Sequence, residues 1–172
     1  MEKDGVKNGK GKEYKFDGIG LLFEGEYLNG KRNGKGKEYY DNGNLIFEGE
    51  YLNGERNGKG KEYYYNGKLM FEGEYLNGNR NGKGKEYDWN GQLKFEGEYL
   101  NGEKWNGNGY NNNNNIIYSL KDGKGYTKEY YGDGELSFEG EYLNGKRNGK
   151  GKEYYDVGTL KFEGEYLYGN RK

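Results

Sequence analysis

Residues 47–64 read FEGEYLNGERNGKGKEYY, and the opening of this stretch recurs along the chain. The hexapeptide FEGEYL begins at six positions, which are Phe23, Phe47, Phe71, Phe95, Phe138 and Phe162. Four successive copies lie 24 residues apart, and the last two copies have the same spacing. A unit of this length cannot bury a core alone, so its stability has to come from packing against neighbouring units. The sequence therefore predicts a repeat protein.

The 172-residue chain is polar for a folded protein but rich in aromatic side chains. Hydrophobic residues make up 30% and charged residues 33%, a balance that favours disorder when taken alone. Aromatic residues make up 17%, led by 21 Tyr, and each can bury roughly 150–250 Å². The 35 Gly, without any Pro, indicate turns and close packing. Tyrosine and glycine at fixed spacing predict an ordered fold.

Several classes of site are excluded by residues that the chain lacks. It has no Cys and no His, so it lacks disulfides, thiolate metal sites and the commonest general base. Its net charge of -1 argues against nucleic-acid binding. We expect no cofactor, no metal and no small-molecule substrate. Because neither a signal peptide nor an apolar span is visible, we expect a cytoplasmic protein, either free or peripheral at a membrane.

The repeats form one array over residues 1–172, and its regularity varies along the chain. The parts are a partial N-terminal unit (1–22), regular repeats (23–102), degenerate repeats (103–137) and regular C-terminal repeats (138–172). The degenerate part contains an all-Asn run at residues 111–115, which we interpret as a flexible insertion.

Within a unit, Asn42-Gly43 between alternating segments predicts a two-residue type I′ hairpin turn. This turn fixes a register. On one face it pairs Tyr40 with Leu45, Glu38 with Phe47, Gly36 with Gly49 and Gly34 with Tyr51. On the other face it pairs Tyr39 with Ile46, Lys37 with Glu48 and Lys35 with Glu50. The two Lys–Glu pairs follow from the turn alone, which supports the register.

The second connection, a loop over residues 53–58, has to keep Phe47 and Tyr51 on the same face as Gly60 and Tyr64. A row of structural glycines then crosses the sheet and leaves room for the rings; its members in FEGEYL are Gly25, Gly49, Gly73, Gly97, Gly140 and Gly164. We predict an all-β fold, an elongated single-layer twisted antiparallel meander of two-stranded hairpins. One face carries an aromatic trough and the other carries Lys–Glu pairs.

Residues 23–43, FEGEYLNGKRNGKGKEYYDNG, resemble the MORN (membrane occupation and recognition nexus) repeat family, whose units look like YEGEWxNGxxxGxGxxxxxxG. Phe replaces the usual leading Tyr, and the 24-residue period is similar to that of variant MORN repeats. The resemblance covers nearly the whole chain. It implies scaffolding, homodimerisation and, in some members, contact with anionic phospholipids.

The aromatic face is the first candidate site, because a one-layer sheet has no second layer to cover it. Its residues are Phe23, Tyr27, Phe47, Tyr51, Phe71, Tyr75, Phe95, Tyr99, Phe138, Tyr142, Phe162 and Tyr166. One interpretation is that a protein partner or a second copy binds there. The alternative is that the rings bury each other over the glycine row.

A basic position in the predicted loop is the second candidate site, occupied by Arg32, Arg56, Arg80, Lys104, Arg147 and Arg171. Loops two strands apart lie about 9–10 Å from each other, so these side chains would line one sheet edge. Such a line can bind anionic phospholipid headgroups, at about 1 kcal/mol for each basic residue. A solvated edge explains the pattern equally well, since Glu55 and Glu103 lie in the same loops.

No candidate catalytic residue emerges. Glu48 and Glu50 recur in every regular repeat opposite lysines, whereas catalysis needs one asymmetric group of residues. The leading hypothesis is therefore a non-enzymatic scaffold that binds a protein partner or itself, through its aromatic and glycine face or a terminal strand edge. The alternatives are peripheral binding to anionic membranes through the basic line and, with less support, a carbohydrate-binding module.

Overall fold

The computed structural model describes residues 7–16, 18–131 and 134–172. Within these residues the chain forms 15 β-strands and no helix, as predicted for an all-β repeat protein. The chain divides into two compact units, of which the first ends at Asn81 and the second begins at Gly82. In the described part of the chain, no helix is long and apolar enough to cross a membrane.

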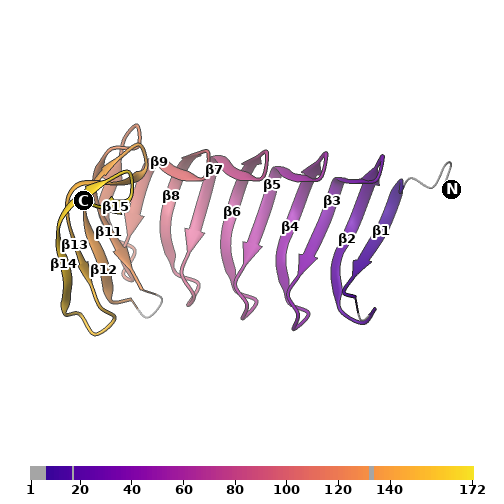
Figure 1. Ribbon diagram of the computed structural model, residues 1–172, viewed down its shortest axis with the longest axis horizontal. Coiled ribbons are helices and arrows are strands. Elements are labelled where there is room, and N and C mark those ends of the chain that lie inside the picture. Colours follow the sequence, from indigo (N-terminus) through magenta and orange to yellow (C-terminus); the bar gives the residue numbers. More distant parts are fainter. Residues whose placement is uncertain (1–6, 17, 132–133) are drawn as a thin grey trace. The chain divides into compact units, whose positions relative to one another are not determined.

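Unit 1 is a single-layer antiparallel meander. Its strands are β1 (Gly9–Tyr14), β2 (Leu21–Leu28), β3 (Lys31–Tyr39), β4 (Leu45–Leu52), β5 (Glu55–Tyr63), β6 (Leu69–Leu76) and the first residues of β7 (Asn79–Tyr87). Each strand from β1 to β5 pairs with the next strand in the sequence, as Figure 1 shows. Because every connection is a hairpin, no strand crosses over another, and the predicted meander is confirmed.

Unit 2 contains the rest of β7 and strands in two sheets. The first sheet continues with β8 (Leu93–Leu100), β9 (Glu103–Tyr110) and β10 (Ile116–Leu120). The second consists of β11 (Gly125–Tyr130), β12 (Leu136–Leu143), β13 (Lys146–Tyr154), β14 (Leu160–Leu167) and β15 (Asn170–Arg171). Among the described residues of these sheets, the paired strands are consecutive and antiparallel.

The predicted register of β3 against β4 is confirmed except next to the turn. Gly36 faces Gly49, Lys37 faces Glu48 and Glu38 faces Phe47. Tyr39, however, faces Leu45 across a β-bulge, so the predicted pairs of Tyr39 with Ile46 and Tyr40 with Leu45 are wrong.

The turn type explains this difference. Tyr40 donates to the Asn44 carbonyl at 2.8 Å, and Gly43 donates to the Tyr40 carbonyl at 3.0 Å. A type I′ turn requires a positive φ at both central residues. Gly43 has a φ of 83°, but the φ of Asn42 is not positive. The loop is a type I turn closed by a glycine bulge, and the Asn42 side chain accepts a hydrogen bond from the Asn44 N–H at 2.9 Å.

The type I′ turn lies instead at Asn53-Gly54, where φ is 53° and 99°. Leu52 therefore faces Glu55, and Tyr51 faces Arg56. The predicted loop over residues 53–58 is wrong beyond the first two residues, because β5 already begins at Glu55 and absorbs the extra residues in a bulge. Asn tolerates the left-handed conformation, so two residues suffice to reverse the chain.

The glycine row is confirmed as the floor of the core. Gly36, Gly49 and Gly60 face one another across three strands. A Cβ atom added to Gly49 would lie 2.7 Å from the Gly60 Cα and 2.7 Å from Cζ of Phe47. The Phe47 ring covers this space and is 0% exposed. We call this row the glycine lane, since bare backbone is what lets the rings approach the sheet.

The Asn run at residues 111–115 is a regular turn, so its interpretation as a flexible insertion is wrong. Asn114 donates to the Asn111 carbonyl at 3.0 Å, and Asn111 donates to the Asn115 carbonyl at 3.0 Å, as in the turn at Tyr40. Asn114 has a φ of 58° and takes the place of the turn glycine. Asn can do so because its short polar side chain tolerates the left-handed conformation.

The sheet is interrupted in unit 2 where side chains occupy the glycine lane. Leu120 on β10 faces Gly107, and Thr127 on β11 faces Gly140. Both replace a lane glycine, and both are buried. In the turn between them, Lys121 and Lys124 exchange two backbone hydrogen bonds of 2.9 Å each. We attribute the break in the sheet between β10 and β11 to the side chains of Leu120 and Thr127.

The glycine lane predicts a stability effect. Gly49→Val should lower the free energy of unfolding by about 3 kcal/mol, because the new side chain overlaps backbone atoms of β5 and the Phe47 ring. Thermal melts followed by circular dichroism measure this. Glu50→Val, an exposed position on the opposite face of the same strand, is the control and should have a small effect. Equal melting temperatures for the Gly49 variant and the unmodified chain would contradict the lane.

Candidate functional site

Arginine and glutamate side chains form an ion-pair ladder in unit 1. The Arg56 guanidinium lies 2.8 Å from the Glu38 carboxylate and 3.1 Å from that of Glu62. Arg32 lies 2.6 Å from Glu13 and 3.3 Å from Glu38. Arg80 extends the series by pairing with Glu62. Arg32 and Arg56 thus each bridge a carboxylate on their own strand and one on the preceding odd-numbered strand.

The ladder lies over the aromatic rings. The Arg56 guanidinium carbon is 4.2 Å from the centroid of Phe47, and that of Arg32 is 4.0 Å from the centroid of Phe23. The other cations over phenylalanine rings are Arg80, Lys104, Arg147 and Arg171. Each ring is therefore held between bare backbone below and a cation above, an arrangement that adds cation–π attraction to apolar burial.

These contacts correct the predicted place of the basic residues. They were expected in loops along a solvated sheet edge, but Arg56 lies within β5 and faces Tyr51. The physical reason is the two-residue turn at Asn53-Gly54, which moves Arg56 into the strand and onto the aromatic face. Anion binding by these residues is untested and stays a prediction, although the carboxylates of the ladder already partner them.

Tyrosine hydroxyls complete the ladder. Tyr51 donates to Glu38 at 2.6 Å, and Tyr27 donates to Glu13 at the same distance. Burial and the bond to Glu38 raise the pKa of Tyr51. Burial alone would raise the pKa of Glu38, but hydrogen bonds from Arg56 and Tyr51 bring it below the ordinary value of 4.5. Both groups therefore keep their ordinary charge at neutral pH.

The predicted aromatic face forms the core. Phe47 packs edge-on against Tyr51, with centroids 5.6 Å apart, and against Tyr75 at 5.2 Å. Ten of its twelve residues are buried, and Tyr142 and Phe162 are partly exposed. This burial matches the alternative in which the rings cover each other. Direct binding of a partner by the rings stays an untested prediction, and it would have to displace the cations above them.

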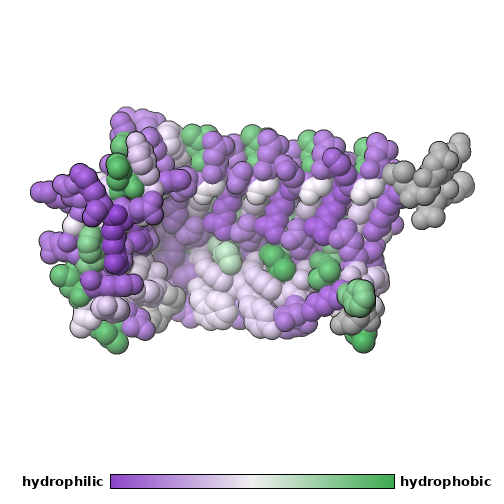
Figure 2. Space-filling model, in the orientation of Figure 1, coloured by the Kyte–Doolittle hydropathy of each residue, from purple (hydrophilic) through white to green (hydrophobic). Residues whose placement is uncertain are grey.

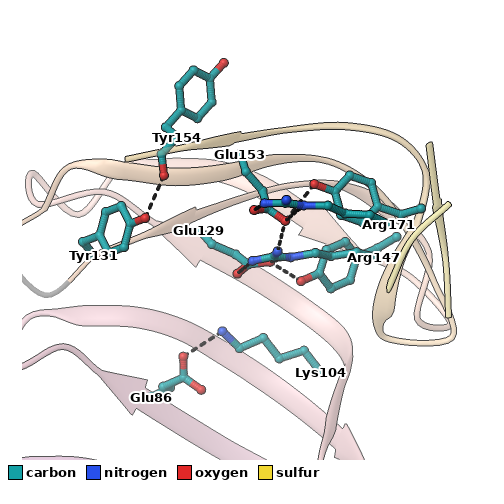
Figure 3. Close-up of polar contacts among 10 residues, drawn as sticks. Glu86, Lys104, Glu129, Tyr131, Arg147, Glu153, Tyr154 and Arg171 are labelled. Carbon is teal, nitrogen blue, oxygen red and sulfur yellow. Dashed lines mark hydrogen bonds and ion pairs between the residues drawn. The ribbon is translucent and has the colours of Figure 1, made fainter. Parts of the chain in front are cut away.

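Unit 2 contains the same ladder in an interrupted form (Figure 3). Arg147 lies between Glu129, at 2.7 Å, and Glu153, at 3.1 Å. Arg171 also pairs with Glu153. Lys104 lies 2.7 Å from Glu86. Burial would lower the pKa of Lys104, but the negative charge of Glu86 raises it, so its amine stays protonated.

One anion and one cation are missing together in the degenerate repeat. Gly109 faces Phe95, where other repeats place the ladder glutamate. The Tyr118 ring fills that space and stacks on Phe95 with centroids 6.4 Å apart. The following turn, Asp122-Gly123, leads directly to Lys124 and β11 without a ladder arginine. The paired loss keeps the ladder electrically balanced.

The opposite face carries the predicted Lys–Glu pairs. Lys37 lies 3.9 Å from Glu48, which confirms this pair. Tyr39 donates to Glu24 at 2.6 Å, and burial together with this bond raises the pKa of Tyr39 to about 12. Glu48 and its equivalents thus have structural partners in each repeat. Among the described residues, no group of three or more metal-ligating side chains is close enough to hold a metal ion.

A row of partly exposed leucines was missed in the sequence. It occupies the last position of every FEGEYL: Leu28, Leu52 and Leu76 in unit 1, and Leu100, Leu143 and Leu167 in unit 2. The three in unit 1 are 52%, 49% and 48% exposed. Strand alternation places Leu52 on the polar face with Glu48 and Glu50. In Figure 2, hydrophobic side chains recur at one end of the strands, beside a hydrophilic band.

We call the three leucines of unit 1, Leu28, Leu52 and Leu76, the leucine row. The signal that could have found it was present, since an apolar residue two positions after a surface glutamate breaks the polar alternation of its face. The rest of FEGEYL has the alternation of a core strand, which hides this signal.

Residues 3–19, 23–45, 47–68 and 138–160 match the MORN repeat, and residues 80–101 match the MORN repeat variant. The chain belongs to the MORN repeat family. Among curated proteins, none matches the sequence. MORN repeats form a family of non-catalytic scaffolds that generally bind proteins or membranes.

The MORN repeats of this chain share one construction. Each regular repeat supplies a lane glycine, a ring over it and a cation over the ring. This core buries the rings between backbone and cations, so it explains the fold of the MORN repeat. An apolar surface feature that recurs with the repeats and is left partly in solvent is the leucine row.

The ladder predicts acid sensitivity. Hydrogen bonds from Arg32 and Arg171 lower the pKa of Glu13 and Glu153, and the pKa of Glu38 is also below 4.5. A folded-state pKa below the unfolded one gives stability that is present above about pH 4.5 and lost as the pH falls through the folded value. Urea unfolding should therefore show a flat free energy near neutral pH and a decline below about pH 4.5. Glu38→Gln, although less stable, should show a shallower decline; an unchanged slope would contradict the role of Glu38.

Proposed function

We propose that this MORN-repeat chain is a non-catalytic scaffold that binds a protein partner along the leucine row. The observation that supports this most is the recurrence of a half-exposed Leu at the end of FEGEYL in the three repeats of unit 1, at a position that core packing does not require. Isolated exposed leucines are ordinary on protein surfaces. A series in register with the repeat is different, because each repeat of unit 1 contributes the same side chain to one line.

The spacing of the row suits an extended contact. Successive leucines lie two strands apart, which corresponds to about 9–10 Å. In unit 1, Leu28 faces Lys31 and Leu52 faces Glu55, so charged side chains of both signs flank the row. Apolar anchors with a polar rim are the usual composition of a protein interface. The row therefore favours a protein partner that supplies apolar side chains at matching intervals.

The membrane alternative has less support. It depended on an exposed line of basic residues, but Arg32 and Arg56 each contact two carboxylates of the ladder. On the polar face, lysines such as Lys37 and Lys61 pair with glutamates of the neighbouring strand. A net charge of -1 adds no general attraction to anionic lipid.

Site-specific photo-crosslinking in cells tests the protein-binding proposal. A photoreactive residue at Leu52 should form an adduct with a defined protein, whereas the same residue at Lys61, in mid-strand on the polar face, should not. Leu28→Ser combined with Leu76→Ser should reduce the Leu52 adduct about tenfold or more, because truncated interface anchors commonly cost over 1 kcal/mol each. The same adducts from both positions, or no reduction in the double variant, would contradict the leucine row as the binding surface.

Vesicle sedimentation tests the membrane alternative. With phosphatidylcholine vesicles that contain phosphatidylserine, at low salt, we expect the chain to stay in the supernatant, because its ladder cations are already paired. Phosphatidylcholine vesicles alone are the control. Sedimentation that requires phosphatidylserine and disappears when salt is added would support the membrane alternative instead.

A further inference from the structure

We infer that a second copy of this chain adds its β1 to the exposed edge of β14, so that copies join head to tail. The site differs from the leucine row and consists of backbone hydrogen-bonding groups, the end of the glycine lane and apolar side chains in two turns. Edge strands present unpaired N–H and C=O groups and are templates for another strand.

The outer edge of β14 is only partly paired among the described residues. On one side Gly164 faces Gly151 of β13. On the other side β15 pairs with Tyr166 and Leu167, and Lys172 donates to the Glu165 carbonyl at 2.9 Å. By contrast, β4 pairs along most of its length with both β3 and β5. The segment of β14 from Leu160 to Gly164 therefore has a strand on one side only.

The glycine lane is open at this edge. The atoms nearest to a Cβ atom added to Gly49 include the backbone of β5, whereas the three nearest to one added to Gly164 all belong to the Phe162 ring. Phe162 is correspondingly partly exposed, while Phe47 is 0% exposed. A further strand with glycine opposite Gly164 would restore the cover that Phe47 has. The exposed edge of β14 therefore fits a strand with the sequence GKGKEY, which places a glycine opposite Gly164.

The β1 strand meets this specification. Its sequence, GKGKEY at residues 9–14, is identical to residues 58–63 of β5, which pair with strands on both sides. If β1 takes the register of β5 against β4, its Gly11 faces Gly164 and its Lys12 faces Glu163. The charge complementarity matches that of Glu48 with Lys61 in β4 and β5.

Apolar side chains in two turns, the one between β1 and β2 and the one between β13 and β14, support the same pairing. The turns that precede β4 and β6 contact each other, since the Asn42 side chain donates to the Tyr65 carbonyl at 3.1 Å. Val157, in the turn before β14, is 76% exposed. Phe16 and Ile19, in the turn after β1, are almost fully exposed. Head-to-tail addition places these two turns next to each other and removes the three side chains from water.

The addition requires β15 to move aside. In its own unit, the Lys7 carbonyl accepts a hydrogen bond from Gly30, as the Arg32 carbonyl does from Gly54. Lys7, two residues before β1, therefore holds the position that Arg171 holds in β15, and both cannot occupy one edge. Because β15 has only two residues, both exposed, it is the segment that yields. The joint uses different surfaces on the two copies, so addition can continue beyond a dimer.

Sedimentation velocity across a concentration series tests the inference. The 172-residue chain should show a mass that rises with concentration and passes that of a dimer. A capped variant, extended after Lys172 by Gly-Lys-Gly-Lys-Glu-Tyr, supplies the missing strand within the same chain. It should remain monomeric over the same range. A control extension, Gly-Lys-Val-Lys-Glu-Tyr, places a side chain against Phe162 and should leave association intact.

Three results would overturn the inference: a chain that stays monomeric, a mass that stops at the dimer, or a capped variant that associates as the unmodified chain does. A monomeric chain would show that the two strands do not pair. A mass that stops at the dimer would indicate a symmetric interface, and a capped variant that still associates would place the association on another surface. None of these results bears on crosslinking at Leu52. Circular dichroism of the extended variants confirms that each retains its strands.

Discussion

The structure depends on the close approach of a phenylalanine ring to bare backbone. Phe47 fits over the sheet only because Gly49 and Gly60 have no side chain, and Cζ of the ring occupies the space that a Cβ atom would need. A one-layer sheet has no second layer to bury apolar surface. The ring, the tyrosines on both sides and the guanidinium above it form a core within the thickness of one sheet and its side chains.

The ion-pair ladder follows from that constraint. A ring that lies on one sheet face still has an outer side, and Arg56 covers it while Glu38 and Glu62 balance the charge. Each partly buried cation needs such partners, since an unpaired one would be costly. The ladder explains why the basic residues recur with the rings, and it leaves the leucine row and the strand edges as surfaces for other molecules.

The sequence predicted the sheet well, because independent signals agreed. The Asn-Gly pairs, the opposed Lys37 and Glu48 and the FEG glycines all required the same register. The sequence-based prediction failed where the same Asn-Gly pair can form two different types of turn. Asn42-Gly43 and Asn53-Gly54 look alike, yet only the second forms a type I′ turn, and this choice decides whether Arg56 lies in a loop or over a ring. The turn at Asn114 was missed because asparagine replaces the expected glycine.

The central claim is that phenylalanine rings rest on the glycine lane, and proton NMR of a sample labelled selectively at Phe and Gly tests it most directly. The account predicts nuclear Overhauser contacts between Phe ring protons and the Hα protons of lane glycines on two adjacent strands, as Cζ of Phe47 requires for Gly49 and Gly60. Rings whose contacts are confined to their own strand, or that show none to glycine, would contradict it.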